Sequence, residues 1–223
     1  MIELTVDGKP VAIEEGRNLL QGCLENDIYI PHLCFLEGMS NPPASCRLCF
    51  VEIGNQDRPV TACKVQPEPG MVVRTDSAAV RRLQRSALRL LLSVHHVDCR
   101  HCPSNKRCEL QKMAKFLGVR LRPRRLEHLE REQPMPQEHP LFEFDLHRCV
   151  LCGKCVEVCR ERTGHALLTF AKRGFDTVIT AFDAGDPDQL PCGKCLACVE
   201  VCPVSAIFLK GSDESEYNLP GRC

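Results

Sequence analysis

Two stretches of this chain share one cysteine spacing: Cys149-Val-Leu-Cys152-Gly-Lys-Cys155-Val-Glu-Val-Cys159 and Cys192-Gly-Lys-Cys195-Leu-Ala-Cys198-Val-Glu-Val-Cys202. In such a C-x2-C-x2-C-x3-C run, three closely spaced thiolates reach one 4Fe–4S cluster, and the fourth cysteine ligates the cluster of the other run. The first predicted ligand set is therefore Cys149, Cys152, Cys155 and Cys202. The second is Cys159, Cys192, Cys195 and Cys198.

Zinc is the alternative occupant of these runs, because cysteines two residues apart also bind zinc. Two matched runs of four cysteines favour iron–sulfur clusters over zinc. Pro203 follows the second run, as the ferredoxin pattern expects, whereas Arg160 stands at the equivalent place after the first run. This departure affects a local turn and leaves the predicted ligands intact.

A separate set of cysteines occupies the N-terminal part of the chain, at Cys34, Cys46, Cys49 and Cys63. Four thiolates suit a 2Fe–2S cluster, although the first gap is longer than in plant-type ferredoxins. The small residues at Ala44 and Ser45 would let backbone N–H groups approach the cluster sulfurs and raise the cluster potential. Zinc is a stronger alternative here than in the repeated runs.

The middle of the chain combines a histidine with three cysteines, Cys99, Cys102 and Cys108. Three cysteines leave one iron of a 4Fe–4S cluster without a protein ligand. His95 precedes Cys99 in H-x3-C spacing, one helical step away, and could close the site. A neutral imidazole in place of a thiolate should raise the potential, as it does in Rieske centres. His95 is therefore the predicted fourth ligand.

Two further histidines and two cysteines fall outside these ligand sets. His96 is one residue too close to the next cysteine, and His101, between two cysteines, is expected to point outward. Cys23 lies on the apolar face of a predicted helix, where a small core residue is expected. Cys223, the last residue, is expected to be an exposed thiol without a role.

Alternating apolar residues predict a small sheet in the N-terminal part. Strands are expected at 2–6 and 11–13, joined by an Asp-Gly turn. Asn18 can begin a helix that runs past Leu24 and crosses the sheet. The later predicted strands lie at 49–53, 60–62 and 72–74.

The next segment reads as two helices followed by a charged connector. Asp76 or Ser77 can cap the first helix, and Gly118 ends the second. The apolar residues that recur at three- and four-residue steps in the first helix are Val80, Leu83, Ala87, Leu90, Leu91 and Val94. Residues 120–138, rich in arginine and with several prolines, predict a solvated linker or, alternatively, a basic strip that docks an acidic partner.

These elements predict an α+β chain made of small modules. The predicted parts are a β-grasp 2Fe–2S ferredoxin-type domain at 1–78, a small helical 4Fe–4S domain with one histidine and three cysteine ligands at 79–119, a linker at 120–138, a two-cluster 4Fe–4S ferredoxin-like domain at 139–211 and a polar tail at 212–223.

The composition suits modules that are stabilised by bound metal. The 223 residues include 17 cysteines, two tyrosines and no tryptophan, so the apolar core of each module is small. The N-terminus lacks the apolar stretch of a secretory signal, and no segment is long enough to span a bilayer, so we expect a cytoplasmic protein with reduced thiols. Lysine plus arginine and aspartate plus glutamate total 29 each, which gives no basic excess for nucleic acid.

The order of these motifs resembles the N-terminal iron–sulfur region of the large peripheral-arm subunit of respiratory complex I. It is still more similar to that region in NAD(P)-linked hydrogenases and formate dehydrogenases, including their small stand-alone diaphorase subunit. The likeness covers residues 1–210. The motifs that carry it are Cys34…Cys63, His95-x3-Cys99-x2-Cys102-x5-Cys108 and the lead-in Pro140-Leu-Phe-Glu-Phe-Asp145 before Cys149.

The resemblance implies an electron-transfer subunit that is not catalytic alone. It implies one 2Fe–2S and three 4Fe–4S clusters that relay electrons between a flavin- and NAD(P)H-binding subunit and a catalytic subunit. Both complete ferredoxin runs resemble the hydrogenase and formate dehydrogenase relatives more than most complex I chains. The expected complex is a soluble hydrogenase, with electron bifurcation left open. The same relay in a formate dehydrogenase or a complex I-like NADH dehydrogenase is one alternative, and a zinc-stapled scaffold is another. No G-x-G-x-x-G follows a strand, so nucleotide binding is expected on a partner.

Overall fold

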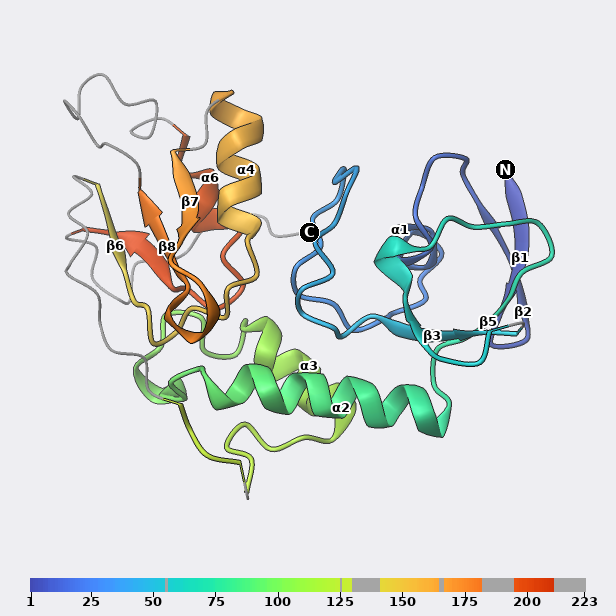
Figure 1. The fold of residues 1–223 in the computed structure, drawn as a ribbon, viewed down its shortest axis with the longest axis horizontal. Helices are drawn as coiled ribbons and strands as arrows, with labels where there is room; N and C mark the ends of the chain where they lie inside the picture. The colour runs from blue at the N-terminus through green and yellow to red at the C-terminus, as the bar shows by residue number, and fades with distance from the viewer. Residues whose placement is uncertain (55, 125, 130–140, 165–166, 182–194, 211–223) are drawn as a thin grey trace. The chain divides into compact units, whose positions relative to one another are not determined.

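The computed structural model describes the chain except for residues 55, 125, 130–140, 165–166, 182–194 and 211–223. It divides into two compact units, Met1–Leu90 with Met113–Arg120 and Leu91–Lys112 with Leu121–Cys223. Figure 1 shows helices and sheets in the chain, which confirms the predicted mixture of α and β elements. The finer division, with parts ending at 78, 119, 138 and 211, stays a prediction.

The first unit is built on a five-stranded sheet in the order β2-β1-β5-β3-β4. The strands are β1 (Ile2–Val6), β2 (Lys9–Ile13), β3 (Phe50–Ile53), β4 (Val60–Thr61) and β5 (Val72–Arg74). Strands β1 and β5 are parallel, and the other neighbours are antiparallel. Asp7 and Gly8 take φ angles of 49° and 79°, the positive values that a two-residue hairpin turn needs.

Helix α1 (Leu19–Glu25) packs on this sheet and begins where the sequence predicts. The Asn18 side-chain oxygen accepts a hydrogen bond from the Gln21 backbone N–H at 3.0 Å, which caps the helix. Cys23, a residue of α1, is fully buried in the core, so its predicted role as a small core residue is confirmed. After β4, Ala62 begins the short helix η1 (Ala62–Lys64), so the predicted strand at 60–62 is one residue too long.

Helix α2 (Ala78–Ser93) is capped by Ser77, whose hydroxyl accepts a hydrogen bond from the Val80 backbone N–H at 3.2 Å. Its most buried positions are Val80, Gln84, Leu88 and Leu92, one helical turn apart. Of the predicted apolar stripe, Val80 and Ala87 are buried, whereas Leu90 is 62% exposed. The sequence pattern missed Gln84 because it is polar. Its side-chain amide is nevertheless buried and donates to the Phe50 carbonyl at 3.1 Å.

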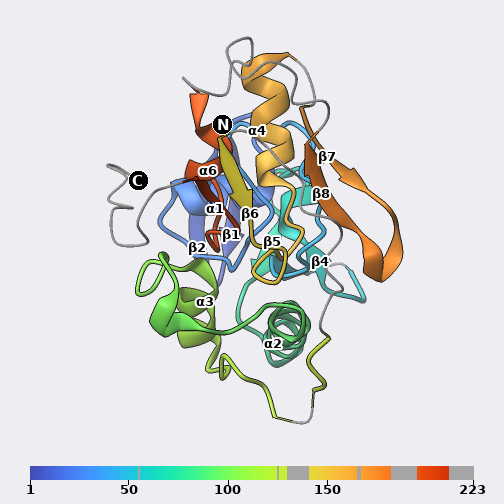
Figure 2. The same cartoon turned by 90° about the vertical axis from the view of Figure 1, so that its left-hand side faces the viewer.

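The second unit contains shorter elements, of which Figure 2 labels β6, α4, β7, β8 and α6. They are η2 (Cys99–His101), the start of α3 (Glu109–Leu117), β6 (Phe142–Phe144), α4 (Lys154–Thr163), β7 (Leu168–Ala171), η3 (Gly174–Asp176), β8 (Val178–Ala181), α6 (Ala197–Glu200) and β9 (Ile207–Leu209). Strands β6 and β9 form one antiparallel pair, and β7 and β8 form another. Helix α4 packs against both α6 and β7.

In the part of the chain that the structure describes, no helix is both long enough and apolar enough to cross a membrane.

Candidate metal centres

The N-terminal cysteines gather in one group within the first unit, although they come from separate segments. Cys34 and Cys46 lie in the long loop between α1 and β3, Cys49 directly precedes β3, and Cys63 lies in η1. All four side chains are buried. The Sγ atoms of Cys34 and Cys46 are 3.4 Å apart. The fold therefore brings the predicted 2Fe–2S ligands into one buried group.

The thiols of this group shift one another's pKa values in pairs. A hydrogen bond with Cys46 lowers the pKa of Cys34 to about 5, with further hydrogen bonds from Ser45. The same thiol pair, together with burial, raises the pKa of Cys46. A hydrogen bond with Cys63 raises the pKa of Cys49 and lowers that of Cys63. Thiols that share protons in this way are close enough to act together as ligands once deprotonated.

The backbone around Cys46 is bent so that it can wrap a compact group. Ala44 and Arg47 both take a φ angle of 52°, in the left-handed region that residues with a Cβ rarely enter. The Arg47 guanidinium carbon lies 4.9 Å from the centroid of the Phe50 ring, a cation–π contact that holds the bend. Such unusual backbone angles are typical of binding loops.

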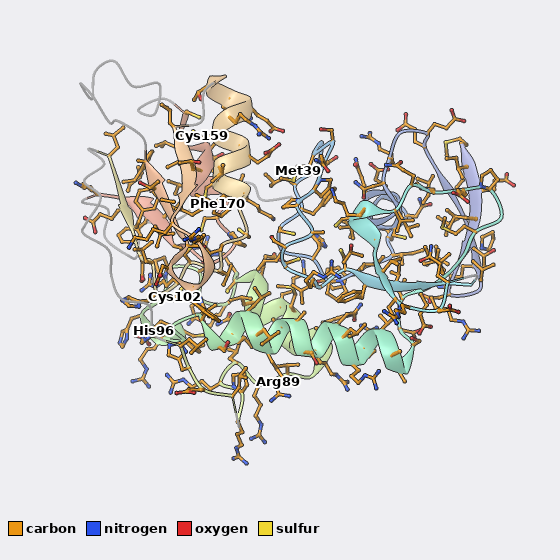
Figure 3. All side chains as sticks on the ribbon, viewed as in Figure 1. Met39, Arg89, His96, Cys102, Cys159 and Phe170 are labelled. Atoms are coloured by element: carbon orange, nitrogen blue, oxygen red, sulfur yellow. The ribbon has the colours of Figure 1, made fainter. Side chains whose placement is uncertain are left out.

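The predicted histidine–cysteine set lies in the segment that follows α2. Cys99 begins η2, Cys102 follows it, and Cys108 directly precedes α3. Burial is the main cause that raises the pKa of Cys102 and of Cys108, and the charge of Cys99 contributes to both shifts. These three thiols therefore lie near one another. Figure 3 shows Cys102 and His96 in this segment.

His95 is the buried histidine of this segment, but the predicted helical step between His95 and Cys99 is wrong. Helix α2 ends at Ser93, so His95 and Cys99 are not joined by a helical step. His95 is 8% exposed, whereas His96 is exposed and the His101 side chain is 68% exposed and pairs with Asp98 at 2.8 Å. Burial lowers the pKa of His95, which favours the neutral imidazole that a metal ligand requires.

Three cysteines of the first run and one cysteine of the second run line a single cavity in the second unit. Cys149, Cys152, Cys155 and Cys202 all face it, and its other walls are mostly apolar. Burial raises the pKa of Cys152 to about 12 and also raises that of Cys155, with the neighbouring thiols contributing. Four soft sulfur donors in an apolar cavity fit an iron–sulfur cluster, since such clusters take thiolate ligands.

Backbone N–H groups point at two of these sulfurs. The Leu151 N–H donates to Cys149 Sγ at 3.4 Å, and the Ala206 N–H donates to Cys202 Sγ at 3.2 Å. Leu151 and Gly153 take φ angles of 53° and 77°, which turns the loop sharply enough to aim its groups inward. Hydrogen bonds of this kind tune the potential of a cluster when one is bound.

Only some ligands of the last predicted 4Fe–4S cluster lie among the described residues. Cys159 on α4 (Figure 3) and Cys198 on α6 are buried on two helices that pack together, and Cys195 lies just before α6. Cys192 and Cys223 fall outside the described residues. The charge of Cys198 contributes to the raised pKa of Cys155, so these two cysteines lie near each other.

Among the described residues, no three His, Cys, Asp or Glu side chains converge tightly enough for a single metal ion. A cluster is several atoms wide, so its thiolates stand further apart than the sulfurs around zinc, each of which is about 2.3 Å from the ion. The assignment of each side chain to a cluster stays a prediction.

The sequence missed a turn that links two of these sites. Asp145 and Arg148 form an ion pair with 2.9 Å between Oδ2 and Nε, and the Arg148 carbonyl accepts a hydrogen bond from His95 Nδ1 at 2.8 Å. The available signal was the Asp-x-x-Arg spacing directly before Cys149.

Two protein-family models match the chain. One, described as a 2Fe-2S iron-sulfur cluster binding domain, matches residues 1–78. The other, the NADH-ubiquinone oxidoreductase-G iron-sulfur binding region, matches residues 84–122. The chain thus contains a 2Fe–2S-binding domain and a 4Fe–4S-binding domain.

Curated relatives match almost the whole chain. The NADPH-Fe(3+) oxidoreductase subunit alpha of Geobacter sulfurreducens is 36% identical over 94% of this chain and 24% of its own length. Subunit HndD of the NADP-reducing hydrogenase of Solidesulfovibrio fructosivorans is 33% identical over 97% of this chain and 37% of its own length. The mitochondrial NADH-ubiquinone oxidoreductase 78 kDa subunit of Neurospora crassa is 30% identical over 94% of this chain. The chain spans between 24% and 37% of the length of these relatives.

A solved structure also resembles the chain closely. It is a chain of a crystal structure of NAD+-reducing NiFe-hydrogenase in the H2-reduced state, with a TM-score of 0.82 and 28% sequence identity. The match covers 98% of this chain and 90% of that chain.

Proposed function

Because this chain is a relative, over nearly its full length, of iron–sulfur subunits of complex I and of NAD(P)-linked hydrogenases, we propose that it is an electron-transfer subunit of such an oxidoreductase. It relays electrons between a flavin- and NAD(P)H-binding subunit and a catalytic subunit. It performs no catalysis by itself, and nucleotide binding lies on the partner.

Four clusters form the proposed relay, one 2Fe–2S and three 4Fe–4S. The 2Fe–2S ligands are Cys34, Cys46, Cys49 and Cys63. The ligands of the first 4Fe–4S cluster are His95, Cys99, Cys102 and Cys108. The ligands of the second are Cys149, Cys152, Cys155 and Cys202, and those of the third are Cys159, Cys192, Cys195 and Cys198.

The observation that carries this proposal is the shared cavity of the first repeat run. The repeat rule assigns Cys202, from the second run, to the cluster of Cys149, Cys152 and Cys155. Those four side chains line one cavity. A chain that used each run as a separate zinc site would instead bring each run's own four cysteines together.

The bound clusters supply one-electron reduction and oxidation, and the protein positions and tunes them. Buried thiols with raised pKa values must release protons when they bind iron, so assembly of the sites is coupled to proton release. The apolar walls around Cys155 and Cys202 exclude water. The N–H groups of Leu151 and Ala206 stabilise negative charge on the ligand sulfurs.

The proposed catalytic partner is that of a cytoplasmic NAD(P)-linked hydrogenase. The structural likeness to an NAD+-reducing NiFe-hydrogenase and the relative from an NADP-reducing hydrogenase support this choice. The likeness to NADH-ubiquinone oxidoreductase supports the second candidate, a relay in a complex I-like NADH dehydrogenase. The motif likeness to formate dehydrogenases keeps that enzyme as a further alternative.

Isolation of the intact complex tests the partner. The chain should be tagged in its host and purified without oxygen, and the co-purifying metals and flavin should be measured. Flavin with nickel or with a di-iron site supports the hydrogenase, and molybdenum or tungsten supports the formate dehydrogenase. Flavin without any of these metals supports the NADH dehydrogenase. A colourless, zinc-rich chain without flavin would overturn the relay proposal.

A further inference from the structure

The turn at Asp145–Arg148 is tied together by one carboxylate. Asp145 Oδ1 accepts from the backbone N–H groups of His147 at 3.0 Å and Arg148 at 3.2 Å. Asp145 Oδ2 pairs with Arg148 Nε at 2.9 Å. The Arg148 and Asp145 side chains are 13% and 25% exposed, so this pair is better shielded from water than a surface ion pair. Loss of the carboxylate would release three polar contacts at once.

The same turn holds the histidine segment at two adjacent points. The Arg148 carbonyl accepts from His95 Nδ1 at 2.8 Å, and the His147 carbonyl accepts from the His96 backbone N–H at 2.7 Å. A carbonyl can only accept, so His95 must carry its proton on Nδ1. The Nε2 lone pair is then available for iron. Histidine ligands usually donate their other ring N–H to a fixed acceptor in this way.

The turn is also bonded to the neighbouring cluster site. Arg148 is joined by its peptide bond to Cys149, and Asp145 itself lines the cavity of Cys149 and Cys202. The Asp145 N–H donates to the Ala206 carbonyl at 2.9 Å, and the Ala206 N–H donates to Cys202 Sγ. One short turn therefore connects a proposed ligand of one cluster with two proposed ligands of the next.

We propose that Asp145 and Arg148 are positioning residues that couple the ligand sets of these two clusters. The Asp145 carboxylate fixes the turn, and the Arg148 carbonyl then sets the tautomer and orientation of His95. The inference rests on the proposed function, since it needs iron at both sites. It assigns a role to residues that no cluster-binding motif includes.

The test uses the full chain, labelled with nitrogen-15 histidine and purified without oxygen. Pulsed electron paramagnetic resonance of the reduced protein measures the coupling of the His95 nitrogens to their cluster. A chelator then measures how fast each cluster signal is lost. Asp145→Ala is compared with Asp145→Asn, which keeps one acceptor oxygen, and with Glu143→Ala, an exposed position two residues away.

In Asp145→Ala we expect a changed histidine coupling and a loss of the histidine-ligated cluster about 10-fold faster than in the parent, the lower range for a lost outer contact of a metal ligand. The coupling and the rate of cluster loss of Asp145→Asn should fall between those of Asp145→Ala and the parent. Glu143→Ala should match the parent. The 2Fe–2S signal should persist in every variant, since its ligands lie in the other compact unit, and it reports that this other unit has folded.

Unchanged coupling and unchanged chelation in Asp145→Ala, with a normal histidine signal in the parent, would overturn this inference alone. A parent without any nitrogen-coupled cluster would overturn the ligand assignment of the proposed function, and the inference with it. If Asp145→Ala lost its 2Fe–2S signal through misfolding, the coupling and chelation of Asp145→Asn would test the inference instead. Parent-like coupling and chelation in that variant would then count against a role for the carboxylate.

Discussion

Cys23 differs from the proposed ligand cysteines in what surrounds its thiol. It is fully buried in the apolar core of the first unit, and no other cysteine contributes to its pKa shift. The proposed ligands sit in groups whose thiols influence one another. The sequence separated Cys23 from most ligands, because most ligands recur in short steps whereas Cys23 follows the period of its helix.

Cys23 is therefore expected to be unreactive. Burial, with a smaller contribution from Asp7, raises its pKa from 9.0 to about 12. At pH 8 its thiolate fraction should be about a thousandfold below that of a free cysteine, tenfold for each pKa unit. Mass spectrometry after iodoacetamide treatment should find Cys23 unmodified in the folded protein and modified in urea. Rapid modification in the folded protein would contradict this. Between pH 9 and pH 12 the unfolded chain releases this proton first, so stability should fall as the pH rises.

The histidine ligand gives a second prediction at this scale. His95→Cys replaces a neutral ligand with a negative one, so the first 4Fe–4S cluster should persist with a lower potential. Redox titration followed by electron paramagnetic resonance measures that shift, with exposed His96→Ala as the matched control. An unchanged signal in His95→Cys, together with a lost signal in His96→Ala, would show that the wrong histidine was chosen.

At the scale of elements, helix α1 is held close to the sheet by a glycine. A Cβ added to Gly22 would stand 2.4 Å from Ile13 Cγ2, a distance that requires the buried Ile13 side chain to move. Gly22→Ala should therefore lower the free energy of unfolding by about 1–3 kcal/mol, the range for an overpacked core. Urea unfolding measures this change. At Gly54 an added Cβ would make an ordinary 3.5 Å contact, so Gly54→Ala should change the stability little.

The crossed ligation of the repeat gives the second prediction at this scale. Cys202→Ser should remove the signal of the cluster held by Cys149, Cys152 and Cys155, and leave that of the other run. The reason is that Cys202 lines the cavity of the first run. Cys223→Ser is the control and should keep both signals. Loss of only the second run's cluster in Cys202→Ser would mean that the runs are not crossed.

At this scale, sequence patterns predict strands and helices from alternation, turn residues and hydrophobic periodicity, but they do not predict contacts that form only on folding. Alternation and turn residues placed β1, β2 and β5 within a few residues. In α2, Gln84 was missed because one hydrogen bond to the Phe50 carbonyl holds it in the buried line, which hydrophobic periodicity cannot detect. The Asp145 turn was missed for the same reason, since its role depends on backbone carbonyls that come into contact only after folding.

At the scale of the whole molecule, the sequence predicted four sites, and the predicted ligands of three of them all lie among the described residues. The groups at Cys34 and at Cys149 each bring distant cysteines together. The fourth depends on Cys192, which lies outside the described residues. The catalytic partner could not be predicted firmly, because the relatives that share these motifs belong to hydrogenase and NADH dehydrogenase assemblies alike.

The central claim is that this one chain holds four iron–sulfur clusters, and the most direct measurement is the iron and acid-labile sulfide content of anaerobically purified protein. One 2Fe–2S and three 4Fe–4S clusters predict about 14 irons and as many sulfides per chain. Mössbauer spectra should show both cluster types. A reproducible content of roughly a third of that iron, in protein that has lost no cofactor, would contradict the account.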